Sequence, residues 1–102
     1  MKYDTAPEFD GDFKRLGDRE QGLFMKAVHK MIEACKPEPD HIPNWPAELR
    51  VERLTDHPGI FGMTWSFAGP DGRATFEIVS DEDADPVLRW RRIGDHKIYK
   101  KP

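Results

Sequence analysis

The sequence has little cysteine and no long apolar run. These features argue against a disulfide-stabilised protein and against a membrane-spanning one. Cys35 is the only cysteine, so no disulfide can form within the chain, which favours a reducing, cytoplasmic location. No stretch approaches the ~20 apolar residues that a membrane helix needs. The first residues also lack the apolar centre of a signal peptide. We therefore expect a cytoplasmic protein that does not contact a membrane.

The chain also lacks an overall positive charge and a recognisable metal site. Its formal net charge is -3, whereas proteins that coat nucleic acid with their whole surface are usually basic. Cys35 and the four histidines do not show the spacing of metal ligands. We expect no metal and no cofactor, and any contact with nucleic acid must involve a local patch.

Such a patch is present near the C-terminus. The stretch Val87–Lys101 holds six cationic residues and one acid, a net charge of +5. The rest of the chain therefore carries about -8. Trp90, His96 and Tyr99 lie among these cations. Cations hold phosphate, aromatic rings stack on bases, and histidine transfers protons near neutral pH. The alternative is an ordinary edge strand followed by a solvated basic tail.

The first half of the chain predicts a short strand followed by two helices. Residues 2–5 are the candidate strand, and Thr5 is expected to cap the first helix, with Pro7 in its first turn and Glu8 at the capping-box position. Gly17 predicts the end of this helix. A second helix is expected from Asp18 to near Cys35. The apolar residues at helical spacing are Phe9, Phe13 and Leu16 in the first helix and Phe24, Val28 and Met31 in the second.

The second half predicts strands at hairpin spacing. Alternating apolar residues indicate strands at 49–54, 60–67 and 73–79, and the basic stretch supplies the last strand. Residues 1–102 are expected to form a single domain, because a chain of this length builds one core. The fold class is α+β, with two N-terminal helices packed on an antiparallel sheet of four to five strands. The expected core residues are Leu23, Phe24, Val28, Met31, Phe61, Met63, Trp65, Phe76, Ile78 and Trp90.

Four motifs in this order resemble the RelE/ParE superfamily of toxins from bacterial toxin–antitoxin systems. They are TAPEFDGDFKRL, HPGIFGMTW, GRATFEIV and LRWRRIGDHKIY. The last motif resembles the tail of YafQ-like toxins, in which an arginine precedes a Gly-x-His sequence and an aromatic residue follows. The resemblance covers nearly the whole chain. It implies a RelE-like fold, a partner antitoxin, and an mRNA endonuclease that acts on the ribosome without a metal.

The resemblance also implies roles for five residues. Glu52 lies where YoeB-like toxins carry a general base, although it would also fit an exposed strand carboxylate paired with an arginine. Arg73 and Arg92 match arginines that act on the scissile phosphate. His96 is a candidate acid or base, and the roles of Glu52 and His96 could be exchanged. Tyr99 could stack on a base or simply pack the tail on the sheet.

The other cations of the patch are expected to contact the RNA backbone. They are Arg89, Arg91, Lys97, Lys100 and Lys101. The chain departs from RelE at Gly62 and Thr64, which stand where RelE carries lysines. It therefore lacks one catalytic set. Two alternative functions remain: a ParE-like inhibitor of DNA gyrase, and a catalytically silent protein that only binds an antitoxin.

Overall fold

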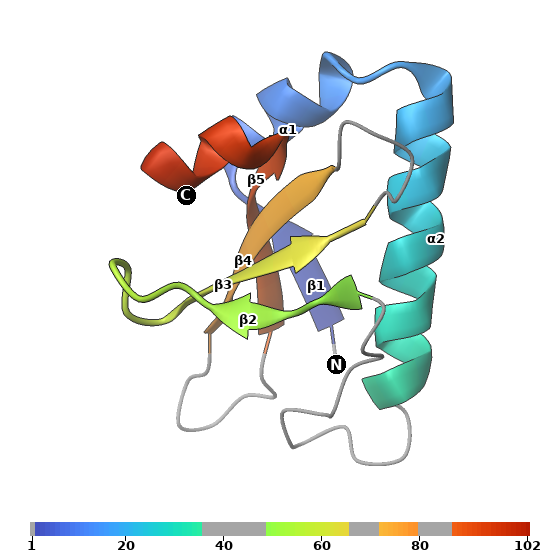
Figure 1. Ribbon diagram of the computed structural model, residues 1–102. Coiled ribbons are helices and arrows are strands. Elements are labelled where there is room, and N and C mark those ends of the chain that lie inside the picture. The colour runs from blue at the N-terminus through green and yellow to red at the C-terminus, as the bar shows by residue number, and fades with distance from the viewer. Residues whose placement is uncertain (1, 36–48, 66–71, 80–86) are drawn as a thin grey trace.

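A five-stranded sheet organises the protein, shown in Figure 1 as a computed structural model that describes residues 2–35, 49–65, 72–79 and 87–102. The strand order is β1-β5-β4-β3-β2. Strands β2 to β5 are antiparallel, as the hairpin spacing predicted, but β1 pairs with β5 in parallel. The sheet is therefore mixed. The strands are β1 (Lys2–Thr5), β2 (Glu52–Arg53), β3 (Ile60–Thr64), β4 (Arg73–Val79) and β5 (Val87–Gly94).

Helices lie on both sides of this sheet. Helix α1 (Pro7–Lys14) packs against β5, and α2 (Asp18–Cys35) covers one face of the sheet. The short 3-10 helix η2 (His96–Lys100) follows β5 and packs against β4 on the opposite face (Figure 1). No helix in the described parts of the chain is long and apolar enough to cross a membrane. The two N-terminal helices expected from the sequence are confirmed.

The core lies between the sheet and the two N-terminal helices. Aromatic rings dominate it: the Phe24 ring meets Trp90 edge-on at a centroid distance of 4.9 Å, and Phe76 meets Trp90 at 5.3 Å. Such edge-to-face pairs add to the stabilisation from burial. All ten residues that the sequence assigned to the core either are buried in this cluster or pack against it.

The start of α1 differs from the expected capping box. Thr5 belongs to β1, where it pairs with Trp90, and Ala6 occupies the N-cap position without a side-chain cap. The Thr5 hydroxyl donates instead to Asp10 Oδ1 at 2.7 Å. The parallel pairing with β5 extends through Ala6, whose N–H donates to the Trp90 carbonyl oxygen at 2.8 Å. Tertiary pairing therefore overrides the local capping signal.

The first strand of the second half is shorter than predicted. The expected strand at 49–54 is reduced to Glu52–Arg53. Arg50 has a φ of 47°, a left-handed backbone that cannot continue a strand. Leu49, which was not among the expected core residues, is nevertheless buried. The strand expected at 60–67 is observed over Ile60–Thr64, and residues 66 and 67 lie outside the described parts.

Candidate active site

The face of the sheet opposite α2 carries the candidate site. Glu52, Gly62, Thr75 and Arg92 are successive partners across β2, β3, β4 and β5, so they form one row on this face. Neighbouring strands lie about 4.8 Å apart, which separates the Cα atoms of Glu52 and Arg92 by about 14 Å. These two predicted site residues are therefore at opposite ends of the row.

Helix η2 covers the middle of this row. Its N-terminus is capped by Asp95, whose carboxylate accepts from the Lys97 N–H at 2.8 Å. Ile98 is buried, and the Tyr99 hydroxyl lies directly on Gly62. A Cβ atom at position 62 would lie only 2.7 Å from that hydroxyl oxygen, closer than real contacts allow. The absence of a side chain at Gly62 thus makes the position of Tyr99 possible.

Tyr99 brings two of the predicted charged residues together. Burial raises the pKa of the Tyr99 phenol, and the negative charge of Glu52 raises it further, while the positive charge of Arg73 opposes the shift. Tyr99 lies on Gly62, whose partners on the neighbouring strands are Glu52 and Thr75, and Arg73 lies two residues before Thr75 on the same face of β4. Glu52, Arg73 and Tyr99 therefore form one cluster, which we call the Tyr99 cluster. Glu52 is exposed and Arg73 is half-buried, so the cluster faces solvent.

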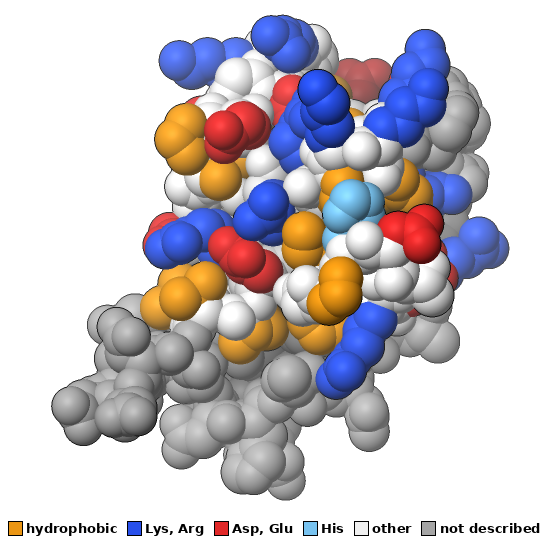
Figure 2. All heavy atoms as spheres, turned by 90° about the vertical axis from the view of Figure 1, so that its left-hand side faces the viewer, with side chains coloured by type: hydrophobic (Ala, Val, Ile, Leu, Met, Phe, Trp, Pro, Cys, Tyr) orange, Lys and Arg blue, Asp and Glu red, His pale blue; other side chains and the backbone are white. Residues whose placement is uncertain are grey.

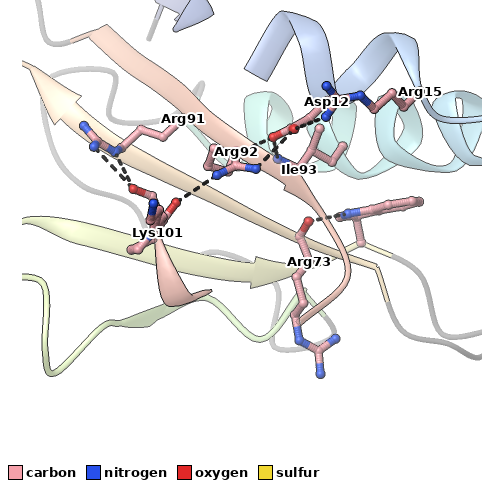
Figure 3. Close-up of polar contacts among 9 residues, drawn as sticks. Asp12, Arg15, Arg73, Arg91, Arg92, Ile93 and Lys101 are labelled. Atoms are coloured by element: carbon pink, nitrogen blue, oxygen red, sulfur yellow. Dashed lines mark hydrogen bonds and ion pairs between the residues drawn. The ribbon is translucent and has the colours of Figure 1, made fainter. Parts of the chain in front are cut away.

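Arg92 is not part of the Tyr99 cluster, because its guanidinium is held by α1. Arg92 Nε donates to Asp12 Oδ2 at 2.5 Å, and Nη2 donates to Oδ1 at 3.3 Å. Asp12 is buried, and its carboxylate also accepts from the Ile93 N–H at 3.3 Å. The hydrogen bond to Asp12 is the main reason why the pKa of Arg92 is raised. In Figure 3, Arg92 points to Asp12, while the Arg73 guanidinium points away from both.

The Arg92 side chain also contacts the C-terminal segment, residues 96–102, which we call the tail. Its Nη1 donates to the Lys101 carbonyl oxygen at 3.1 Å, so one guanidinium links α1, β5 and the residues after η2 (Figure 3). This arrangement makes Arg92 a positioning residue for the tail. The side chain of His96 lies outside the described parts of the structure, although its backbone begins η2 directly beside the Tyr99 cluster.

The remaining predicted cations divide into paired and exposed side chains. Arg89 bonds to Asp4 at 3.0 and 3.2 Å, and this contact is the main reason why the pKa of Arg89 is raised. Arg91 Nη1 lies 3.3 Å from Glu77. Three lysines are exposed: Lys97, Lys100 and Lys101. Figure 2 shows cationic side chains spread over this side of the molecule, with acidic ones between them.

A cleft of about 440 Å³ opens beside the C-terminal segment. It lies next to the Tyr99 cluster, but none of the three residues of that cluster lines it. Its walls come from α1, the turn before β3, β5 and the tail. They consist of Ala6, Glu8, His57, Ile60, Arg91, Arg92, Lys100, Lys101 and Pro102.

Three residues of this region were missed by the sequence analysis. Asp12 lies on the same helical face as Phe9 and Leu16, and a carboxylate within an apolar stripe is a signal for a buried ion pair. Thr75 is fully buried in the site row, and the described part of the chain offers its hydroxyl no hydrogen-bond partner. His57, in the turn before β3, lines the cleft. Among the described residues, no three His, Cys, Asp or Glu side chains gather as metal ligands would.

The burial of Tyr99 predicts a specific loss of stability in alkali. The folded state raises the pKa of the phenol above its ordinary value of 10.0. The neutral phenol is therefore favoured by folding, and this contribution is fully present below pH 10 and is lost as the pH rises through the folded-state pKa. Tyr99→Phe should make the decline in the free energy of unfolding above about pH 10 less steep. Urea titrations of both proteins at a series of pH values measure this slope, and equal slopes would contradict the burial of the hydroxyl.

Comparison with solved structures identifies the fold. No protein-family model matches the sequence, and no curated protein matches it. The intact E. coli RelBE toxin–antitoxin complex contains a similar chain, with a TM-score of 0.58 and 12% identity over 92% of this chain and 94% of that one. A mutant of the E. coli toxin RelE in the free state is similar with a TM-score of 0.62 and 14% identity over 98% and 90% of the two chains. A RelB–RelE antitoxin–toxin complex from Methanococcus jannaschii is similar with a TM-score of 0.54 and 16% identity over 100% of both chains. The chain therefore has a RelE-like fold.

Proposed function

We propose that this protein is the toxin of a toxin–antitoxin pair and that it cleaves mRNA on the ribosome without a metal. The observation that carries the proposal is the meeting of Glu52, Arg73 and Tyr99 on one solvent-facing surface of a RelE-like fold. RNA cleavage of this kind requires a base, an acid for the leaving oxygen, a cation for the phosphate and a group that orients the nucleotide. Glu52, Arg73 and Tyr99 would supply the base, the cation and the orienting group, and His96 would supply the acid.

In the proposed reaction the 2′-hydroxyl oxygen attacks the adjacent phosphorus atom. Glu52 accepts the hydroxyl proton, and Arg73 stabilises the negative charge that develops on the phosphoryl oxygens. The bond to the 5′-oxygen breaks, and His96 donates a proton to this leaving group. Glu52 and His96 could exchange these roles. Tyr99 orients the base, and its seat on Gly62 fixes where the base can lie. Arg92 contributes indirectly, by holding the tail that carries Tyr99.

The proposed partners are an antitoxin, the ribosome and mRNA. Two of the similar solved structures are complexes of RelE with RelB, which supports an antitoxin as partner here. Acidic residues of such a polypeptide would complement the exposed lysines Lys97, Lys100 and Lys101. The antitoxin would silence the protein by covering the Tyr99 cluster.

A cleavage assay on programmed ribosomes tests the proposal. Purified protein in excess over ribosome-bound, end-labelled mRNA should produce discrete fragments, and Glu52→Gln should slow their formation by about 10²–10⁴ if Glu52 is the base or acid. Glu20→Gln is the matched control, because Glu20 is exposed at the start of α2. A parallel assay measures DNA supercoiling by gyrase. Inhibition of gyrase without RNA fragments would support the ParE-like alternative, and inactivity in both assays would support the silent antitoxin-binding alternative.

A further inference from the structure

The cleft beside the tail is lined by cationic side chains, and two of them are arginines that are bonded to other groups of the protein. Among the described residues that line it, four are cations, Arg91, Arg92, Lys100 and Lys101, and one is an acid, Glu8. The two arginines are already engaged by protein groups, whereas the side chains of both lysines are exposed. The lysines are therefore available to a ligand, and the arginines shape the cleft around it.

The backbone that carries the two lysines is fixed by these arginines. Arg91 Nε and Nη2 both donate to the Pro102 carbonyl oxygen at 3.3 Å, and Arg92 Nη1 donates to that of Lys101 at 3.1 Å. Arg91 forms an ion pair with Glu77 at 3.3 Å, and Arg92 donates a hydrogen bond to Asp12. A tail restrained in this way presents its charges at defined positions, which lowers the entropic cost of binding.

The opposite wall of the cleft is suited to a base or a sugar. His57 is half-buried in the turn before β3, and its carbonyl oxygen accepts from the Ile60 N–H at 3.1 Å. This hydrogen bond fixes the turn that carries His57, and both His57 and Ile60 line the cleft. An imidazole can stack on a base or donate to a phosphate, and a neighbouring apolar side chain favours the flat face of a base. An acidic polypeptide would need the cations but not this wall.

The cleft is also at a suitable distance from the Tyr99 cluster. Ile60 lies four residues before Thr64, the partner of Arg73 on β3, a separation of about 13 Å along the strand. A stacked nucleic-acid strand covers this distance in about four nucleotides, at about 3.4 Å each. A strand whose scissile phosphate lies at Arg73 can therefore continue into the cleft.

We propose that this cleft, the tail groove, binds single-stranded RNA next to the cleavage site, with Lys100 and Lys101 on its phosphates and His57 on a base. The inference rests on the proposed function, because that function identifies the ligand as RNA. It adds His57 and Ile60 to the residues that bind the substrate. It also assigns RNA binding in the groove to Lys100 and Lys101 and not to Lys97 and Arg89, because the latter two do not line the groove.

Binding of an RNA that cannot be cleaved tests the tail groove separately from catalysis. The probe is a fluorescent single-stranded RNA with 2′-O-methyl groups, which lacks the attacking hydroxyl, and the readout is anisotropy over a range of salt concentrations. Removing both lysines in Lys100→Ala/Lys101→Ala should weaken binding about 10-fold and reduce the slope of log affinity against log salt by about 1.4, or about 0.7 for each lost phosphate contact. His57→Ala should weaken binding about 5- to 10-fold with little change in slope.

Matched controls remove the same groups from α2, on the other face of the sheet. Lys26→Ala/Lys30→Ala removes two lysines, and His29→Ala removes an exposed histidine. Both should bind the probe as wild type does. Equal losses in the groove and control variants would show an effect of net charge alone and would overturn the proposal. Wild-type binding that is too weak to measure would also overturn it.

Two further outcomes separate the groove from the proposed function. If the groove variants lose affinity for a poly-glutamate peptide but not for the RNA probe, the groove binds an acidic polypeptide and the proposal fails. If the wild type binds the probe through these residues but cuts no RNA, the proposed function fails and the groove stands as an RNA site. Cleavage by wild type together with unchanged probe binding by the groove variants would retain the function and reject the groove.

Discussion

Replacing Asp12 by Ala should lower the free energy of unfolding by about 3 kcal/mol, the lower end of the cost of breaking a buried ion pair. Asp12 is buried, and its carboxylate accepts hydrogen bonds from the Arg92 guanidinium and from the Ile93 N–H. Its loss leaves both donors without this partner. Arg92 remains 28% exposed, so water can solvate part of its charge, which keeps the cost from being higher. Urea unfolding of wild type and Asp12→Ala measures the difference.

Two further variants distinguish the buried pair from a general effect of charge. Arg15 lies 3.5 Å from the same carboxylate but is 80% exposed. Arg15→Ala should therefore cost about 0.5 kcal/mol or less. The double variant Asp12→Ala/Arg92→Ala should cost less than the two single changes together, because neither charge is left unpaired. Additive costs would mean that Asp12 and Arg92 stabilise the fold independently.

The position of Asp12 explains why the parallel pairing of β1 ends where it does. Thr5, the last residue of β1, pairs with Trp90, and β5 continues beyond it to Gly94. From there α1 takes the place of a neighbouring strand, and Asp12 accepts the Ile93 N–H. Apolar spacing predicted α1 and the strands, since each of those patterns is local. Apolar spacing could not predict which strand β1 would pair with, because the paired residues of β1 and β5 are 85 positions apart in the sequence.

The face of the sheet on which the Arg92 side chain lies could not be predicted from the alternation of side chains along β5. Leu88 and Trp90 point into the core, and strict alternation would point Arg92 the same way. A register shift between Thr75 and Phe76 places Arg92 opposite Thr75 and turns Ile93 inward, where it is buried. Such a bulge reorients every side chain that follows it. Composition therefore located the cations along the chain, but the contacts of each arginine depend on one irregularity that composition does not reveal.

The convergence of Glu52, Arg73 and Tyr99 was more predictable. Hairpin order places β2, β3 and β4 next to one another, and alternation along each strand puts the polar residues on the outer face. The sequence could not show that Gly62 provides the seat for Tyr99, because that contact depends on how η2 folds back over the sheet. A glycine within an otherwise apolar strand was the available signal, since it often marks a close approach of another group.

In the proposed reaction, replacing Arg73 by Ala should slow RNA cleavage by about 10²–10³, which corresponds to about 2.7–4 kcal/mol of lost charge stabilisation in the transition state. The guanidinium belongs to the Tyr99 cluster, where its charge lowers the pKa of the phenol. Cleavage is measured in single turnover on ribosome-bound mRNA, with protein in excess, so that product release does not limit the rate. Arg73→Lys keeps the charge but not the planar fork, and it should recover only part of the rate.

A second measurement shows whether the Ala variant removes charge from the cluster or merely disturbs the fold. Without the positive charge of Arg73, the pKa of Tyr99 should rise further, and Tyr3→Phe in both proteins leaves Tyr99 as the only tyrosine in an absorbance titration. Arg19→Ala, an exposed change on α2, should alter neither the rate nor this pKa. A slower reaction with a raised Tyr99 pKa and an unchanged urea midpoint would assign Arg73 to the phosphate. An unchanged rate with the same rise in pKa would mean that Arg73 lies beside Tyr99 without acting in catalysis, and it would contradict the proposed role of the Tyr99 cluster as the cleavage site.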